Sequence, residues 1–228
     1  DLVRRSPLTK HFKRVHLIPF GIDLKLFKQR KNREKIRKGF GIEKDDFVIM
    51  FRQDDQEWKG LPYIKKMLDK LDVDRHIVIL TVGETRLLDE YKKRYKIIEY
   101  EWIRDDNLMV DLYSAADIFL MPSVAESFGM MAIESMACSL PLIVCEGTAL
   151  PSVTFAPECG IAIKQGNPEL FASAVNRLIS MPEERAQRGR KGRELAEKHY
   201  DVSVYNKSMI NLYKDIYSRN QKRKKSKI

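Results

Sequence analysis

The chain has 228 residues, of which 43% are hydrophobic, so it can bury one substantial core, and no apolar stretch reaches the ~18 residues that a membrane-spanning helix needs. Its formal net charge of +10 comes from the ends, because residues 1–38 carry +10, residues 220–228 carry +5 and the middle carries −5. A nucleic-acid-binding domain carries basic residues on its folded surface, so this distribution argues against a nucleic-acid partner.

From residue 47 onward, short β-branched runs alternate with amphipathic stretches. In chain order the sequence predicts a strand at 47–52, a helix at 60–71, strands at 76–82 and 96–100, a helix at 108–116, a strand at 117–122, a helix at 130–139, strands at 141–146 and 160–164, a helix at 168–180, and helical runs from 182 to 219. Continuous apolar strands separated by helices indicate an α/β fold, with a single Rossmann-like parallel sheet and helices on both faces.

The loop after the fourth predicted strand carries a candidate site, because ligands bind outside the carboxyl ends of parallel strands. Glu126 lies in this loop, and a helix is expected to begin just after it, leaving the N–H groups of Phe128, Gly129 and Met130 as unpaired donors for phosphate or sugar hydroxyls. Glu134 follows about 8–12 Å along that helix, a separation that resembles the one between a ribose and a hexose joined by two phosphates. Glutamates at this spacing are common on solvated helices, but Glu134 lies in the apolar run MMAIESMAC, where a buried carboxylate needs partners.

A second candidate site follows the first predicted strand. Arg52 and Lys59 bracket an acidic stretch in FRQDDQEWKG, and a guanidinium together with an ammonium is a common way to hold a diphosphate. The alternative is that both cations pair with the carboxylates of their own loop, Asp54, Asp55 and Glu57.

The stretch ESFGMMAIESMACSLPLIV strongly resembles the family-4 retaining glycosyltransferases of the GT-B fold, whose hallmark is E-x7-E. Three further segments are similar to that family in the right order: IPFGID (18–23), FR…KG (51–60) and LYSAADIFLMPS (112–123). The chain departs from the family pattern at Ser139 and Phe51, where Gly is usual, and in GTALPS (147–152), a loose version of Gly-Gly-x-Pro-Glu.

The resemblance implies a role for each candidate residue. Glu126 would hold the donor hexose and Glu134 the ribose, while Arg52 and Lys59 would stabilise the leaving diphosphate. The catalytic set is then Glu126, Arg52 and Lys59, and the donor-binding set is Glu134, Ser127, Phe128, Gly129, Met130 and Ile103, with the base near Trp102-Ile103-Arg104.

The resemblance also implies a metal-independent enzyme that takes a UDP- or GDP-linked sugar and retains its anomeric configuration. No bound metal or other cofactor is therefore expected. The adjacent acidic pairs at 54–55 and 105–106 are expected to be solvated.

In this family the chain corresponds to the C-terminal, donor-binding half of a two-domain enzyme. We expect residues 1–17 to end a missing N-terminal acceptor domain, residues 18–219 to form the nucleotide-sugar-binding domain with helices that pack toward that domain, and residues 220–228 to be a disordered basic tail. The isolated chain is expected to bind donor but to transfer the hexose weakly or not at all to a glycan or lipid-linked acceptor.

The remaining expectations concern the cellular location of the protein and two alternative classes of function. Three cysteines without a CxxC pair and four scattered histidines give a zinc site no support and fit reduced thiols in the cytoplasm. The basic ends are either solvated tails or a peripheral contact with anionic lipid at the inner face of the membrane, and a role in cell-surface polysaccharide or lipopolysaccharide assembly is a hypothesis. The alternatives are a non-catalytic nucleotide-sugar-binding module and, more distantly, a nucleic-acid-binding α/β domain.

Overall fold

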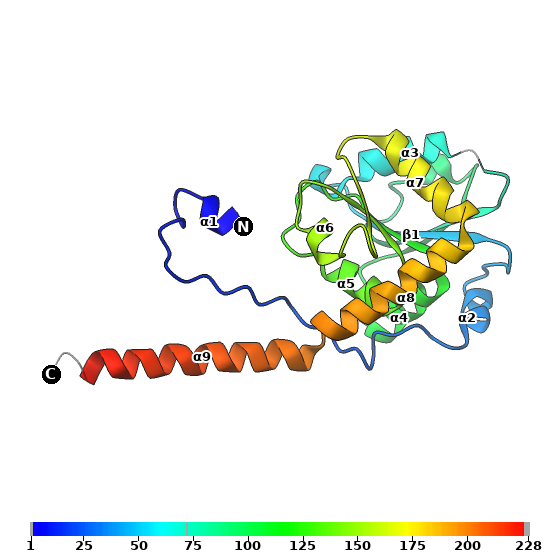
Figure 1. The fold of residues 1–228 in the computed structure, drawn as a ribbon. Helices are drawn as coiled ribbons and strands as arrows, with labels where there is room; N and C mark the ends of the chain where they lie inside the picture. Colours follow the sequence, from blue (N-terminus) through cyan, green and yellow to red (C-terminus); the bar gives the residue numbers. More distant parts are fainter. Residues whose placement is uncertain (1, 72, 226–228) are drawn as a thin grey trace.

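The computed structural model describes residues 2–71 and 73–225, and it contains one six-stranded parallel sheet with helices on both faces (Figure 1). The strands are β1 (Phe47–Gln53), β2 (Ile77–Gly83), β3 (Lys96–Tyr100), β4 (Ile118–Met121), β5 (Leu142–Cys145) and β6 (Ile161–Ile163). Their order in the sheet is β3-β2-β1-β4-β5-β6, which confirms the predicted fold class. Because the order reverses between β1 and β4, the loops that follow these two strands meet at the carboxyl edge.

The predicted helices are present, together with three short ones outside the predicted ranges, α1, α2 and α6. The α-helices are α1 (Leu2–Arg5), α2 (Arg33–Gly39), α3 (Leu61–Lys70), α4 (Asp106–Ala115), α5 (Met130–Ala137), α6 (Leu150–Val153), α7 (Pro168–Ser180), α8 (Pro182–His199) and α9 (Val202–Lys225). Two 3-10 turns, η1 (Glu57–Lys59) and η2 (Asp89–Tyr91), follow β1 and β2.

The core is divided between the two faces of the sheet because successive side chains of a strand point to opposite sides. In β1, Phe47, Ile49 and Phe51 pack with α3 and α7, whereas Val48 and Met50 pack with α4, α5 and α8. All of β2 is buried, and so is all of β1 except Arg52, as is typical of central parallel strands. The one partly exposed side chain of β1 therefore lies at its carboxyl end, where the candidate site begins.

Helix α2 escapes sequence prediction because REKIRKG contains a single large apolar residue. It is anchored instead by Arg37, 4% exposed, which donates to the backbone oxygen of Ala115 at 3.0 Å and to Asp117 at 3.2 Å. Burial lowers the pKa of Arg37, and the nearby Asp117 carboxylate opposes that shift. Asp117 also accepts from Arg33 and from the backbone N–H of Val48, each at 2.8 Å, so one carboxylate joins α2 to the amino edge of the sheet.

Both ends of the described chain extend away from the sheet (Figure 1). The expectation of a disordered tail at 220–228 is corrected for residues 220–225, because α9 continues through Lys225. The rest of that expectation, at 226–228, lies outside the described residues. The sequence there contains no Pro or Gly and is rich in Lys, Arg and Gln, which favour helix. Among the described helices, none combines the length and apolar character needed to cross a bilayer.

Candidate functional site

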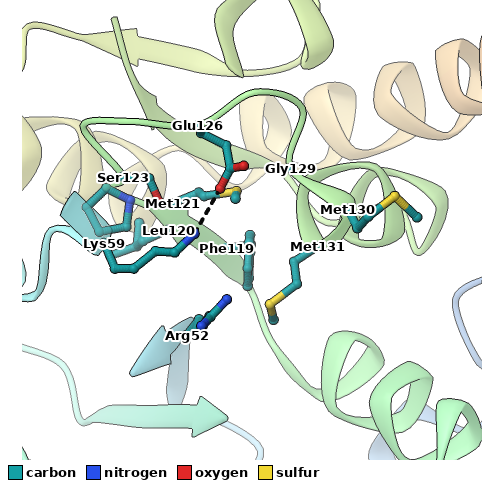
Figure 2. Close-up of a pocket in the computed structure, with 11 residues that line it drawn as sticks. Arg52, Lys59, Phe119, Leu120, Met121, Ser123, Glu126, Gly129, Met130 and Met131 are labelled. Atoms are coloured by element: carbon teal, nitrogen blue, oxygen red, sulfur yellow. Dashed lines mark hydrogen bonds and ion pairs between the residues drawn. The ribbon is translucent and has the colours of Figure 1, made fainter. Parts of the chain in front are cut away.

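A pocket of about 240 Å³ lies at the carboxyl edge of the sheet, where β1 and β4 end (Figure 2). It brings together the three residues predicted to be catalytic, Arg52, Lys59 and Glu126, with Gly129 and Met130 from the donor-binding set. The other lining residues are Phe119, Leu120, Met121, Pro122, Ser123 and Met131. The structure therefore places two basic side chains, one carboxylate and a helix start around one cavity.

Two loops from neighbouring strands are joined beside this pocket. The N–H of Val124, after β4, donates to the backbone oxygen of Trp58 at 2.9 Å. Gly60 has a φ of +82°, and a Cβ there would lie 2.2 Å from the backbone oxygen of Pro122. Because only glycine fits this conformation and this close approach, Gly60 determines where Lys59 enters the pocket.

The two cations of the pocket have different carboxylate partners. Lys59 Nζ lies 3.2 Å from Glu126 Oε2, with the two side chains 18% and 15% exposed (Figure 2). Arg52 instead pairs with Asp54 of its own loop. The alternative in which both cations pair within their own loop therefore holds for Arg52 and fails for Lys59.

Asp54 requires a correction, because the sequence indicated a solvated carboxylate and the structure leaves this residue 1% exposed. Its carboxylate accepts from Arg52 and from the backbone N–H of Gln56, the latter at 3.1 Å. Pairing with a guanidinium compensates the burial of the charge, which explains why this acidic residue is not at the surface.

Helix α5 begins at the pocket with Met130, the first residue of the helix predicted at 130–139. Gly129 precedes its first residue with a φ of +92°, and a Cβ there would lie 2.7 Å from Cδ2 of Leu150. The first N–H groups of a helix have no partner inside it, and here they belong to pocket-lining Met130 and Met131. An anion or a set of hydroxyls in the pocket would meet these donors.

Ser127 and Phe128 do not line the pocket. The N–H of Ser127 donates to Glu126 Oε1 at 3.2 Å, which holds that carboxylate from its own backbone. The ring of Phe128 packs edge-on against Phe20 and Tyr200, with centroids 5.3 Å and 5.9 Å away. Phe128 therefore connects the Glu126 loop to the segment at 18–23, which contains Phe20, and to the end of α8.

Glu134 lies farther along α5 and does not line the pocket either. The sequence predicted that this carboxylate needs a partner, and the structure supplies Tyr113 of α4, whose hydroxyl donates to Glu134 Oε2 at 2.9 Å. Burial raises the pKa of Glu134, although the Tyr113 hydrogen bond opposes the shift, and burial also raises the pKa of Tyr113. Sequence reasoning missed Tyr113, although the run LYSAADIFLMPS that carries it was already singled out.

The segment after β3 contains the predicted base-binding residue. Ile103 is half-buried against the core and lies outside the pocket lining. Its neighbour Trp102 is 58% exposed, and Cζ of Arg52 lies 4.3 Å from the centroid of the Trp102 ring. The expected base-binding segment therefore contacts the phosphate-binding candidate directly.

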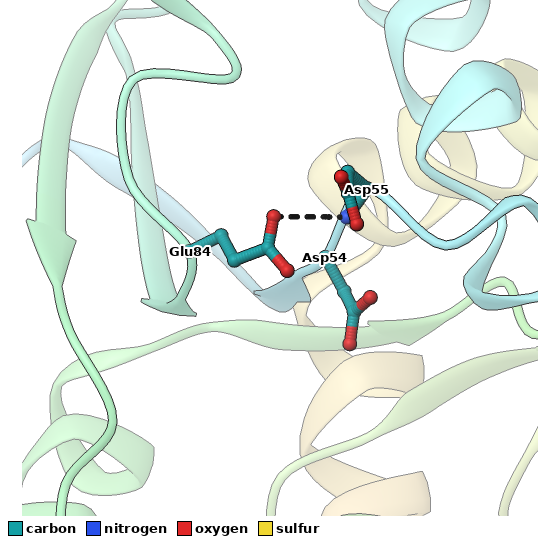
Figure 3. Close-up of side chains that lie close together, drawn as sticks. All are labelled: Asp54, Asp55 and Glu84. Atoms are coloured by element: carbon teal, nitrogen blue, oxygen red, sulfur yellow. Dashed lines mark hydrogen bonds between the residues drawn. The ribbon is translucent and has the colours of Figure 1, made fainter.

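Three carboxylates approach one another beside this site. Oxygens of Asp54, Asp55 and Glu84 lie within 4.8 Å of one another, and Glu84 accepts from the backbone N–H of Asp55 at 3.3 Å (Figure 3). The guanidinium of Arg52 already pairs with Asp54, which reduces the negative charge that this cluster can offer to a cation.

Residues 32–195 match the family model of the group 1 glycosyl transferases, a match that covers more than half of the chain. The chain belongs to the group 1 glycosyltransferases. The matched range contains every predicted catalytic and donor-binding residue. Membership of family 4 and retention of configuration are finer assignments that stay predictions.

Known glycosyltransferases are similar to this chain in sequence and in fold. A GDP-mannose-dependent alpha-(1-6)-phosphatidylinositol dimannoside mannosyltransferase of Mycobacterium tuberculosis is 29% identical over 174 residues, 75% of this chain and 45% of the relative. The sucrose-phosphate synthase of Thermosynechococcus elongatus superposes with a TM-score of 0.83 at 22% identity, covering 96% of this chain and 56% of that one. Anabaena HepE in complex with UDP-glucose superposes with a TM-score of 0.74 at 20% identity, covering 88% and 57%.

All three relatives are longer than the chain described here, which spans less than half the length of the mannosyltransferase and 56–57% of the two solved chains. The two structural similarities, at 22% and 20% identity, establish the fold alone. The predicted α/β architecture and enzyme class are therefore confirmed at the level of fold and family.

Proposed function

We propose that this chain is the donor-binding part of a retaining, family-4 glycosyltransferase that transfers a hexose from a UDP- or GDP-linked donor to a glycan or lipid-linked acceptor. The observation that carries the proposal is the convergence of Arg52, Lys59, Glu126 and the start of α5 on one pocket at the carboxyl edge of the sheet. Two cations and a helix start suit the two phosphates, and a carboxylate suits sugar hydroxyls.

Each residue has a distinct task in this proposal. Arg52 and Lys59 stabilise the diphosphate as negative charge develops on the leaving group, which is the electrostatic contribution that usually dominates catalysis. Glu126 accepts hydrogen bonds from the hexose, and Glu134, in its carboxylate form, accepts from the ribose hydroxyls. Ile103 lies beside the base.

Relatives support the two donor classes in the proposal. The M. tuberculosis enzyme is named as GDP-mannose-dependent, and the Anabaena structure contains UDP-glucose. We propose a UDP- or GDP-linked hexose on this basis, and the base is the first property to measure.

The rest of the reaction needs parts beyond the pocket. In the proposal a further domain binds the acceptor, no metal or other cofactor is required, and the enzyme acts in the cytoplasm. The basic ends, at residues 1–38 and 220–228, support a peripheral contact with anionic lipid at the inner face of the membrane.

Calorimetric titration with UDP, GDP, ADP and their hexose conjugates tests the donor site. We expect saturable binding of one nucleotide family, weakened by Glu134→Ala. If neither this chain nor a longer form of the protein that includes it binds any of these ligands, the proposal is wrong. Donor binding without any transfer by that longer form would favour a non-catalytic nucleotide-sugar-binding module.

A further inference from the structure

The guanidinium of Arg52 is contacted by a residue that does not line the pocket. Cζ of Arg52 lies 4.3 Å from the ring centroid of Trp102, within the ~6 Å over which a cation and an aromatic face attract each other. Arg52 belongs to β1 and Trp102 follows β3, and β2 lies between these strands in the sheet. The contact therefore bridges the carboxyl end of β2.

The end of β2 leaves room for this bridge. β2 ends at Gly83, whose φ is +123°, and a Cβ there would lie 2.4 Å from the backbone oxygen of Gln53 and 3.7 Å from Cγ of Arg52. Beside the bridge, Nε2 of Gln53 donates to Glu99 Oε1 at 3.1 Å, which joins β1 to β3 a second time. The sheet thus sets the backbone position of Arg52, and Trp102 follows two residues after the end of β3.

A guanidinium offers its face and its edge to different partners. It is planar, its N–H donors lie in the plane, and its face is free for an aromatic ring. Cζ of Arg52 lies over the Trp102 ring, and Asp54 accepts from Nη2. Within the described ranges, Asp54 is the one hydrogen-bond acceptor of this guanidinium, while Nε is buried and without a partner. Donors at the remaining edge stay available to an anion in the pocket.

We propose that Trp102 is a positioning residue that holds the Arg52 guanidinium with its donating edge toward the diphosphate of the donor. The inference rests on the function proposed above, in which Arg52 binds that diphosphate. A side chain already in contact with a ring and a carboxylate loses less conformational freedom when the ligand binds. Trp102 acts through Arg52 and makes no contact with the phosphates.

Tryptophan fluorescence tests the contact directly, because the chain has two tryptophans and Trp58→Phe leaves Trp102 as the single reporter. This variant is titrated with pyrophosphate, UDP, GDP, uridine and guanosine. We expect pyrophosphate, which carries no base, to change the emission, and we expect a nucleoside diphosphate to change it more than the nucleoside does. Adding Arg52→Gln is expected to abolish the response to pyrophosphate.

A double-mutant cycle measures the coupling between the two residues. Affinity for the nucleoside diphosphate is measured by calorimetry for the wild type, Trp102→Ala, Arg52→Gln and the double variant. We expect Trp102→Ala to weaken binding about three- to fivefold, as for an exposed cation–π contact, and to cause no further loss once Arg52 is replaced. Trp102→Phe should restore most of the affinity, and Tyr213→Ala, an exposed aromatic on α9, serves as the matched control. Thermal unfolding of each variant verifies the fold.

Three other results are distinguishable. If Trp102→Ala lowers the affinity for nucleosides as much as that for diphosphates, or still lowers affinity in the Arg52→Gln background, the inference is overturned and Trp102 is assigned to the base. Wild-type affinity in Trp102→Ala overturns it and leaves the proposed function intact. Both are overturned if neither the wild-type chain nor a longer form of the protein that includes it binds pyrophosphate or any nucleotide.

Discussion

Lys59 and Glu126 form an ion pair that a donor would have to rearrange. The pair is largely shielded from water, at 18% and 15% side-chain exposure, and spans two loops that are 67 residues apart in the sequence. A diphosphate in the pocket would compete with Glu126 for the ammonium of Lys59. The freed carboxylate could then accept from sugar hydroxyls, so we expect the binding of the two parts of the donor to be coupled.

Lys59→Ala is expected to weaken binding of the nucleoside diphosphate about 10- to 100-fold, because a hydrogen bond to a charged group contributes about 1.5–3 kcal/mol. Lys59→Arg should retain part of the affinity, since it keeps the charge. Lys70→Ala is the matched control, because Lys70 pairs with Glu169 on the surface outside the pocket. Calorimetry measures all three, and an unchanged affinity in Lys59→Ala would remove Lys59 from the site.

Glu134 makes stability depend on pH in the direction opposite to that of most carboxylates. Burial raises its pKa above the ordinary value of 4.5, so the folded chain binds this proton more tightly than the unfolded chain does. Its contribution to the free energy of unfolding is therefore fully present below pH ~4.5 and is lost as the pH rises through the raised pKa.

Glu134→Gln removes this dependence. We expect the variant to unfold at a higher temperature than the wild type near neutral pH, with the difference shrinking as the pH falls to about 4.5. The same variant should bind the nucleotide more weakly, because an amide replaces the carboxylate assigned to the ribose. Glu194→Gln, on the exposed face of α8, controls for removal of a surface charge. A difference in unfolding temperature that is constant with pH would contradict this account.

Among the connecting elements, the turn from η1 to α3 determines the geometry of the pocket. Gly60 closes η1 and precedes α3, and its backbone touches that of Pro122 after β4. The contact joins the Lys59 loop to the Glu126 loop, so a change at residue 60 should affect both stability and binding.

Gly60→Ala is expected to lower the free energy of unfolding by about 2–4 kcal/mol, because the new Cβ would lie 2.2 Å from a backbone oxygen and would require a φ of +82°. Gly39→Ala is the matched control, since no described atom outside its chain neighbours and its own helix backbone lies within 4 Å of a Cβ there, and its effect should stay within about 1 kcal/mol. Urea unfolding measures both variants. Equal effects would show that the close approach at Gly60 does not constrain the turn.

The whole chain spans less than half the length of its curated relative, and its two ends extend away from the sheet (Figure 1). Phe20 contacts Phe128 of the pocket loop at 5.3 Å and Tyr205 of α9 at 6.0 Å. The segment that enters the domain and the helix that leaves it therefore meet beside the loop that carries Glu126.

We expect the isolated chain to bind the donor but to transfer sugar at less than about 1% of the rate of a two-domain enzyme. In the proposed function a further domain positions the acceptor, and positioning both reactants supplies much of the rate enhancement. Transfer from a radiolabelled nucleotide sugar to acceptor, measured beside a longer form of the protein, checks this. Comparable rates would mean that the chain alone completes the active site.

Local sequence patterns were sufficient for the sheet, the main helices and the loop that carries Glu126. Apolar β-branched runs and 3.6-residue periodicity are properties of consecutive residues, so they predict strands and amphipathic helices directly. Helix α2 does not follow from such a pattern, because it is anchored by Arg37 rather than by an apolar face. The continuation of α9 does not follow either, because its last residues carry no apolar periodicity and depend on the helix propensity of Lys, Arg and Gln.

Only the tertiary structure decided which side chains meet. It paired Lys59 with Glu126, Glu134 with Tyr113, and Arg52 with both Asp54 and Trp102. Most of these partners lie on different strands or helices, and their proximity depends on the order β3-β2-β1-β4, which no local pattern encodes. Burial of Asp54 has the same origin, since a carboxylate leaves water only where the folded chain supplies a compensating charge.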